Sequence, residues 1–314
     1  MIEAVGLTKR YGDKTAVSDL TFTVQPGIVT GFLGPNGAGK STTMRLILGL
    51  DAPTSGMVTV GGKPYAQHAE PLKTVGALLE ARAVHTSRSA YHHLLALAAT
   101  HGIARSRVAE VIDMVGLQDV ARKRAGGFSL GMGQRLGIAS ALLADPETLI
   151  LDEPVNGLDP EGIRWIRDLL KTLAAEGRTV FVSSHLMSEM ALTAEHVIVV
   201  GRGRLMADMP MAQLIASAST NVVVVRAPRA IELGQALAGP DVVVSSTERE
   251  TLEVTGLTAA QIGESAAQLG VVLHELTPQQ ASLEEAFMDM TRGEVEYHAA
   301  DPSRPTAIST RSAA

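Results

Sequence analysis

The chain of 314 residues is long enough for more than one domain, carries a net charge of −6, and contains no cysteine. An acidic chain is poorly suited to coating nucleic acid, so no nucleic-acid partner is expected, and the lack of cysteine excludes disulfides and thiolate metal sites. No apolar stretch approaches the roughly 20 residues that cross a bilayer, and the first residues lack the apolar core of a signal peptide. We therefore expect a soluble protein of a reducing cytoplasm, for which a partner supplies any contact with a membrane.

The first 215 residues alternate between strand and helix patterns. Residues 1–75 are rich in strand patterns with a helix at 39–49, and residues 90–143 carry apolar side chains at the three- and four-residue intervals of helices. A further helix is predicted at 162–175. The predicted strands of this part are 2–7, 20–24, 29–33, 57–60, 148–151, 179–182, 197–200 and 204–207. This alternation predicts an α/β fold with a mainly parallel sheet that helices cover on both faces.

A second unit is predicted from about residue 220. Its order of strand, helix, strand, strand, helix, strand is typical of a small split-βαβ domain of the α+β class, followed by a helix at 283–291. The predicted elements are 222–226, 230–237, 242–245, 251–254, 259–269 and 271–275. Beyond Arg292 the periodicity is lost and Pro, Ser, Thr and Ala dominate, which predicts a disordered tail. We divide the chain into domains at 1–215 and 216–292 and a tail at 293–314.

A glycine-rich loop with the sequence GPNGAGKS lies between an apolar strand and a helix, and it matches the pattern G-x-x-x-x-G-K-[ST] in the required context. Glycines let backbone N–H groups turn toward phosphates, and the helix N-terminus adds partial positive charge. We expect Lys40 to bridge the β- and γ-phosphates of a nucleotide and Ser41 to ligate Mg²⁺. The predicted nucleotide contacts are Gly34, Pro35, Asn36, Gly37, Ala38, Gly39, Lys40, Ser41 and Thr42. Kinases, GTPases and ATPases share this loop, so it indicates nucleotide binding only.

Two carboxylates follow a predicted buried strand. Residues 149–151 are apolar, and Asp152 and Glu153 come directly after them. We expect Asp152 to hold Mg²⁺ through water and Glu153 to orient or deprotonate the attacking water. A strand that ends in Asp-Glu is by itself often only a solvated strand end, but a phosphate loop in the same chain favours catalysis.

The segment FSLGMGQR stands between these two motifs and begins a helix that reaches about residue 143. It resembles the signature of the ABC ATPases, which reads LSGGQ followed by a basic residue, Gln and Arg. In that family the serine and glycine contact the γ-phosphate held by the opposite subunit, which implies this role for Ser129 and Gly131. The departures from the pattern are Phe128, Leu130 and Met132. A serine that only caps a helix is an equal alternative for Ser129.

The same resemblance extends over the first two thirds of the chain and implies further roles. Tyr11 stands where the family stacks an aromatic residue on adenine, Asp159 belongs to the loop that couples the two sites of a dimer, and His185 stands where a switch histidine contacts the γ-phosphate. Where the family usually places Gln, residues 75–79 lead into Glu80. A carboxylate is also a Mg²⁺ ligand, so we expect Glu80 to bind the metal, with a solvated loop glutamate as the alternative.

The resemblance also implies a fold, cofactors and partners. The fold is a P-loop ABC-type nucleotide-binding domain with a mixed β-sheet core and a helical subdomain at about 81–145, and the cofactors are ATP and Mg²⁺. Because the chain has one phosphate loop and one signature, two chains must combine, and a homodimer is expected. The chain also resembles the ATPases of daunorubicin- and bacitracin-resistance exporters, and this resemblance lies at Glu80, residues 131–139 and residues 282–287. That implies a subunit bound to a separate permease at the cytoplasmic face of the plasma membrane.

Other nucleotide-dependent proteins fit the sequence less well. A GTPase needs an Asn-Lys-x-Asp string, which the chain lacks. An ATPase of chromosome maintenance inserts a long coiled coil between phosphate loop and signature, and Lys40 and Ser129 lie too close in the chain for one. A soluble ABC ATPase that acts on ribosomes or DNA remains the alternative to a transporter subunit, although such proteins usually carry two cassettes and basic linkers.

Four histidines, at positions 85, 92, 93 and 101, are possible metal ligands. His92 and His93 are adjacent, so on a helix they cannot point at one metal together. No cluster of carboxylates accompanies the four in the sequence. We interpret them as side chains that face solvent or a partner.

Overall fold

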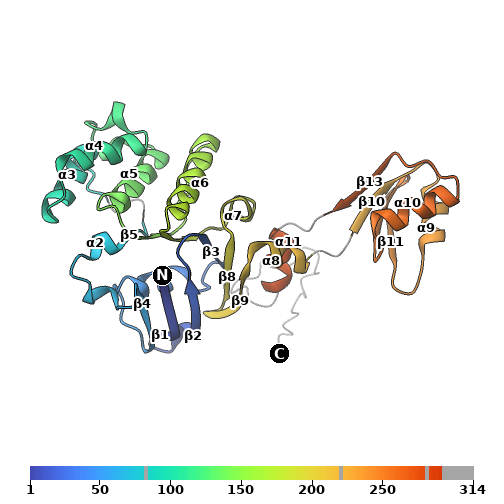
Figure 1. The fold of residues 1–314 in the computed structure, drawn as a ribbon, viewed down its shortest axis with the longest axis horizontal. Coiled ribbons are helices and arrows are strands. Elements are labelled where there is room, and N and C mark those ends of the chain that lie inside the picture. Colours follow the sequence, from blue (N-terminus) through green and yellow to red (C-terminus); the bar gives the residue numbers. More distant parts are fainter. Residues whose placement is uncertain (81–83, 219–221, 280–282, 292–314) are drawn as a thin grey trace, which may run out of the picture.

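The computed structural model describes residues 1–80, 84–218, 222–279 and 283–291, and its N-terminal part centres on a six-stranded sheet (Figure 1). The strand order is β5-β6-β7-β3-β8-β9, and all neighbours are parallel except β8 and β9. The bounds are β3 Val29–Leu33, β5 Val75–Leu78, β6 Thr148–Leu151, β7 Thr179–Ser183, β8 His196–Gly201 and β9 Arg204–Pro210. Every residue of β3, β6 and β7 is buried, as expected of central strands with both faces covered.

A smaller antiparallel sheet, in the order β2-β1-β4, lies beside the first and shares an apolar core with it. In that core the ring of Phe32 from β3 lies 6.0 Å from Phe22 of β2 and 4.9 Å from Phe181 of β7. The elements here are β1 Ile2–Tyr11, β2 Lys14–Val24, α1 Lys40–Ile47, β4 Ser55–Val60, the 3-10 turn Tyr65–Gln67 and α2 Pro71–Thr74. The shared core fixes the end of β3, from which the phosphate loop departs.

Between β5 and β6 the chain forms a helical part, and further helices cover the large sheet (Figure 1). The helical part contains α3 Ala90–Thr100, α4 Arg105–Met114, the 3-10 turns Gln118–Val120 and Ala125–Gly127, and α5 Leu130–Leu142. The other helices are α6 Pro160–Ala175, α7 Met187–Thr193 and α8 Met211–Ala218. Among the described residues, no helix combines the length and apolar character that spanning a bilayer requires.

The C-terminal part has its own sheet, in the order β11-β12-β10-β13, with all neighbours antiparallel. Its elements are β10 Val222–Arg226, α9 Ala230–Leu237, β11 Val243–Glu248, β12 Thr251–Thr255, α10 Ala259–Gln268 and β13 Glu275–Gln279. A separate apolar core forms under α9 and α10, and Val225, Leu252 and Ile262 are among its fully or almost fully buried members. This is the βαββαβ arrangement that the sequence predicts.

The last described helix, α11 Leu283–Thr291, does not belong to that core. It packs against α7 and α8, and its residues Leu283 and Phe287 join the main core with Met211 and Leu214 of α8 (Figure 1). The chain therefore leaves the N-terminal part, forms the second sheet and returns. The predicted domain bounds of 1–215 and 216–292 stay a prediction, and the packing of α11 is the feature that bears on them most.

The clearest disagreement with the sequence prediction concerns the last strand. The strand predicted at 271–275 is β13 at Glu275–Gln279, and Val271 instead packs into the core after α10. Pro278 concealed the strand, because proline donates no backbone hydrogen bond. It is tolerated because, in the part of the chain that the structure describes, β13 lies at the edge of the sheet and β10 is its one partner strand.

The patterns also missed β5, α2, α7 and α8, which are four to eight residues long and too short for a clear periodicity. Two predictions fall on residues that the structure does not describe. These are the predicted tail at 293–314 and residue 282 of the segment that resembles exporter ATPases.

Candidate nucleotide-binding site

The phosphate loop runs from the end of β3 to the start of α1. Gly37 and Gly39 have φ angles of 83° and 99°, a backbone conformation that favours glycine. The neighbouring strands also leave no room for larger residues. A Cβ atom on Gly34 would lie 2.5 Å from the Val200 carbonyl oxygen, and one on Gly39 would lie 2.5 Å from that of Ala16. Glycine therefore lets the loop pass between β2 and β8.

A cleft of about 390 Å³ opens at this loop. Residues 36–42 line it together with Tyr11, Asp152 and Glu153. These residues come from the end of β1, from the phosphate loop with the start of α1, and from the segment after β6. The structure thus gathers in one place most of the residues that the sequence predicts for nucleotide and metal binding.

Lys40 provides the cation of this cleft. Its side chain is buried, and its ammonium donates hydrogen bonds to the carbonyl oxygens of Gly34, at 2.6 Å, and Pro35, at 3.3 Å. Burial lowers the pKa of Lys40, while the carboxylates of Glu153 and Asp152 oppose that shift. A phosphate that enters the loop meets a cation that is partly removed from water, where electrostatic attraction is stronger.

Asp152 holds two hydroxyl groups at the carboxyl end of β6. The Ser41 hydroxyl donates to Oδ2 at 2.6 Å, and the Ser183 hydroxyl donates to Oδ1. Oxygen donors of this kind fit Mg²⁺, which proteins bind through one or two carboxylates together with substrate phosphates. Sequence reasoning missed Ser183. Because β6 and β7 are parallel and Leu151 pairs with Val182, the next residues of the two strands lie side by side, and this pairing is the signal that identifies it.

Glu153 is held in position by three neighbours. Its Oε2 lies 2.6 Å from Nδ1 of His185 and accepts the His185 backbone N–H at 3.2 Å. The Glu153 backbone has a φ of 51°, uncommon for a residue with a side chain. Its N–H donates to the Ser183 hydroxyl at 2.9 Å, and its carbonyl accepts the Gln134 amide at 3.1 Å. These bonds hold the Glu153 backbone in its strained conformation, as is found at many functional sites.

Several predicted residues lie outside the lining of the cleft, among them Ser129, Gly131 and Asp159. The Ser129 hydroxyl caps α5 by accepting the Met132 backbone N–H at 3.2 Å, so its capping role is present. Asp159 caps α6 in the same way, with the Gly162 N–H at 2.8 Å. Gly131 packs closely, since a Cβ atom there would lie 2.7 Å from the Gly157 carbonyl oxygen. Contacts of these residues with a nucleotide of the opposite subunit stay a prediction.

Glu80 lies beside a different cleft. It is exposed, follows β5, and lines a space of about 530 Å³ that also borders α3 and α5. No hydrogen bond or ion pair joins Glu80 to another residue in the described ranges. Its role as a metal ligand stays a prediction, with the solvated glutamate as the alternative. The same ranges hold no group of three or more residues with metal-binding side chains.

His93 lines the same cleft, so it does not face open solvent, and the alternative that it faces a partner stays a prediction. The residue is only 8% exposed because it lies on the inner side of α3. Burial lowers its pKa, and no described residue forms a hydrogen bond with its Nδ1 atom.

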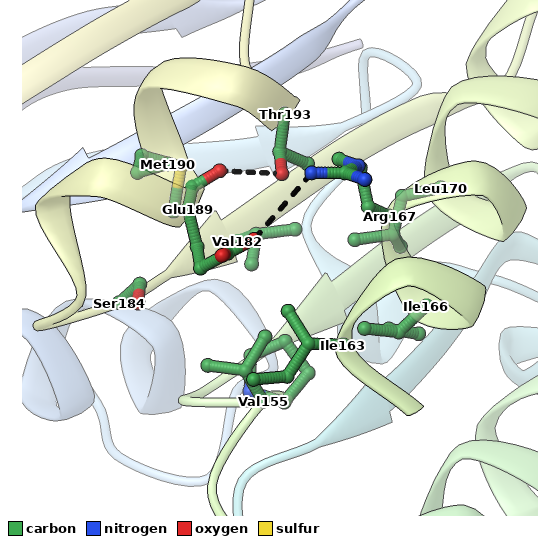
Figure 2. A pocket seen from close by; sticks show the side chains of 11 residues that line it. Val155, Ile163, Ile166, Arg167, Leu170, Val182, Ser184, Glu189, Met190 and Thr193 are labelled. Carbon is green, nitrogen blue, oxygen red and sulfur yellow. Dashed lines mark hydrogen bonds and ion pairs between the residues drawn. The ribbon is translucent and has the colours of Figure 1, made fainter. Parts of the chain in front are cut away.

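A small cavity between α6 and α7 is too small for a nucleotide, at about 20 Å³ (Figure 2). Its lining is mainly apolar, with Val155 and Ile163 on one side and Val182 on the other. The Arg167 and Glu189 side chains, which also line the cavity, form an ion pair at 3.6 Å. The cavity belongs to the packing that joins the helix after Asp159 to the helix after His185.

The chain can now be placed among known proteins. Residues 17–156, which contain the phosphate loop, the signature segment and Asp152, match the family described as ABC transporter. Over 217 residues the chain is 44% identical to the bacitracin transport ATP-binding protein BcrA of Bacillus licheniformis, covering 68% of this chain and 71% of that protein. This chain belongs to the ABC transporter ATP-binding subunits. The family consists of ATPases, so this ABC subunit binds ATP, and the cleft at its phosphate loop is the candidate ATP site.

Two further similarities agree with this membership. The lantibiotic transport ATP-binding protein SrtF of Streptococcus pyogenes is 35% identical over 208 residues, covering 66% of this subunit and 90% of SrtF. The dimeric structure of MJ0796, a bacterial ABC transporter cassette, has a TM-score of 0.62 at 26% identity and covers 67% of this subunit and 99% of that chain. Residues 221–284 match a family described only as a domain of unknown function.

Proposed function

We propose that this ABC subunit hydrolyses Mg-ATP as a dimer and drives export of a peptide antibiotic or another hydrophobic compound through a separate membrane permease. The observation that carries the hydrolytic part is the 2.6 Å contact between Glu153 and His185, directly beside Asp152 at the ATP cleft. Both are groups that can accept or hold a proton near the terminal phosphate.

Nucleotide binding uses the residues that line the cleft. The backbone N–H groups of residues 36–39 and of the start of α1 surround the phosphates, Lys40 neutralises the β- and γ-phosphates, and Tyr11 stacks on adenine. Ser41 and Asp152 would hold Mg²⁺, since their oxygen atoms suit this ion. When bound, Mg²⁺ offsets negative charge on the β- and γ-phosphates. Glu80 is the further candidate ligand.

Hydrolysis uses Glu153 as the residue that orients water and accepts its proton. As the water oxygen bonds to the γ-phosphorus, the bond from that phosphorus to the β–γ bridging oxygen breaks and ADP leaves. The Glu153 side chain is only 22% exposed and contacts His185, while the Glu153 backbone donates to Ser183 and accepts from Gln134. His185 contacts the γ-phosphate and keeps Glu153 directed at the water.

A second copy completes each site. Ser129 and Gly131 lie at the N-terminus of α5, next to Leu130, which is 52% exposed and leaves the surface there open to another chain. Asp159 follows the neighbouring turn. In the dimer these residues contact the ATP held by the opposite subunit, which explains why one phosphate loop and one signature suffice in this chain.

A permease docks at the second cleft, next to the helical part. The cleft of about 530 Å³ is lined by leucines from several segments, including Leu50, which is 56% exposed, Leu72 and Leu97. Apolar surface of this kind is typical of interaction sites. Relatives named for bacitracin and lantibiotic transport support a peptide antibiotic as the cargo. The subunit then lies at the cytoplasmic face of the plasma membrane as a peripheral protein.

The proposal is tested with the Glu153→Gln variant, which keeps ATP bound. The tagged full chain is expressed in its source cell, membranes are isolated with Mg-ATP, and the co-purifying membrane protein is reconstituted into vesicles with the wild-type subunit. We expect the ATPase rate to rise in these vesicles and to change again with bacitracin or a lantibiotic.

The alternative is a soluble ABC ATPase that acts on ribosomes or DNA. The same purified subunit is therefore assayed with ribosomes and with duplex DNA in place of vesicles. No membrane partner, together with an ATPase rate that rises on ribosomes or DNA, overturns the transport proposal while it leaves ATP hydrolysis intact.

A further inference from the structure

The ring of Tyr11 at the ATP cleft is held by the segment that follows α1. The Tyr11 hydroxyl donates a hydrogen bond to Oδ2 of Asp51 at 2.9 Å. The ammonium of Lys9 lies 4.9 Å from the centre of the ring, and it also donates to the carbonyl oxygen of Ala52 at 2.7 Å. The hydroxyl end and one face of the ring thus contact groups tied to residues 51–52, although Tyr11 is 47% exposed.

A glycine turn at the end of α1 brings Asp51 to this place. Gly49 has a φ of 64°, its N–H donates to the Leu46 carbonyl at 3.1 Å, and the Leu50 N–H donates to the Arg45 carbonyl at 2.9 Å. This pair of bonds is the Schellman motif, in which a left-handed residue reverses the chain over the last helical turn. Asp51 therefore lies beside the side chain of Arg45.

Arg45 fixes the carboxylate that Tyr11 uses. Its Nε donates to Oδ2 of Asp51 at 2.7 Å, and its Nη2 donates to Oδ1 at 3.4 Å. The Asp51 side chain is 19% exposed, which limits its freedom to turn toward water. The bonds from Arg45 and then from Tyr11 hold the pKa of Asp51 below its usual value, so the acceptor stays ionised at neutral pH.

We propose that Asp51, fixed by Arg45, is a positioning residue that orients the Tyr11 ring to receive adenine. Tyr11 lines the same cleft as the phosphate loop, so a ring held in place loses less conformational freedom when a base stacks on it. Arg45 lies in the last turn of the helix that begins with Lys40. Helix α1 thus carries the phosphate-binding Lys40 at its start and, at its end, Arg45, which fixes the carboxylate that holds the Tyr11 ring. The inference rests on the proposed stacking role of Tyr11.

The test compares ligands with and without a base. KM for ATP, kcat, and the inhibition constant of inorganic tripolyphosphate are measured for the wild type, Asp51→Ala and Tyr11→Phe. We expect both variants to raise KM for ATP about two- to tenfold, the effect of one lost hydrogen bond, with kcat and the tripolyphosphate constant unchanged. The double variant should match either single variant, because both remove the same bond.

Two matched variants separate the possible failures. Tyr11→Ala removes the ring itself, and an unchanged KM for ATP in that variant overturns the stacking role together with the inference. A raised KM in Tyr11→Ala, with normal values in Asp51→Ala and Tyr11→Phe, overturns the positioning role alone. An equal loss of ATP and tripolyphosphate binding in Asp51→Ala also overturns it, because the change then disturbs the end of α1 and the phosphate loop. Asp51→Asn keeps an acceptor oxygen and should restore part of the affinity.

Discussion

The large sheet and the C-terminal sheet of this ABC subunit arrange their polar residues differently. In the large sheet the parallel strands β6 and β7 end side by side, and Asp152, Glu153 and Ser183 meet at their carboxyl ends. In the C-terminal sheet all neighbours are antiparallel, so adjacent strands end at opposite edges, and Glu253 and Thr277 lie on a sheet face on either side of β10. Parallel strands place the polar residues at their carboxyl ends along one edge of the sheet, whereas antiparallel strands distribute polar residues over a face.

The cores of the two sheets are also separate. Val225, Leu252 and Ile262 belong to a cluster that shares no member with the clusters around the ATP cleft. Catalysis should therefore respond strongly to changes at the edge of the large sheet and weakly to changes in the C-terminal core.

The largest effect is expected from Glu153→Gln. The amide cannot accept the proton of the attacking water, so kcat should fall about 10²–10⁴-fold, while ATP still binds. Single-turnover hydrolysis and sizing with Mg-ATP measure this. The dimer should persist in the variant and dissociate in the wild type as ATP is consumed. A kcat near the wild-type value would remove Glu153 from the catalytic step.

Leu252→Ala tests the independence of the C-terminal core. Leu252 is 3% exposed, and its truncation should lower the free energy of unfolding of that part by about 2–5 kcal/mol. Thermal and chemical denaturation measure the loss, and KM for ATP in the isolated subunit should stay constant. The exposed Ile231→Ala is the matched control, because a side chain that is 69% exposed contributes little on folding. A large rise in KM for ATP in Leu252→Ala would show that the two parts are coupled.

Ser183→Ala sharpens the comparison at the edge of the large sheet. The buried hydroxyl joins Asp152 to the backbone of Glu153, so its loss leaves two partners unsatisfied. We expect the unfolding free energy to drop by about 1–3 kcal/mol and kcat to fall roughly tenfold. Steady-state kinetics and denaturation check both, and Ser183→Thr, which keeps a hydroxyl, should recover most of the activity.

The smallest expected effect is on how the free energy of unfolding depends on pH. Burial, aided by Arg88 and His85, lowers the pKa of His93 in the folded state. Below the ordinary histidine pKa of about 6.5 the unfolded chain then binds more protons, so stability should fall as the pH drops from 7 toward 5. His93→Gln should lose less stability over that range in denaturation curves. An identical pH dependence in the two proteins would contradict a buried neutral His93.

Much of the ATP site was readable in the sequence because its residues are local to short motifs. The loop that ends in Lys40 and Ser41 turns at glycines with positive φ angles. These glycines stand within the same short motif, so the sequence alone identifies the loop. The strand at 148–151 is predicted with its observed bounds, since a β-branched threonine and three apolar residues stand directly before Asp152. Local pattern also identified most elements of the C-terminal sheet, except the edge strand that carries Pro278.

Tertiary structure alone decided the rest, because it brings together residues that are distant in the chain. The contact of Ser183 with Asp152 depends on the register of two strands, and that of Tyr11 with Asp51 depends on the turn after α1. The position of Glu80 beside the second cleft also follows only from the fold, and its role as a metal ligand stays a prediction. The sequence by itself determined which chemical groups this subunit carries. Which of them face one another was decided by strand pairing, helix packing and burial, whose energies come from contacts across the whole chain.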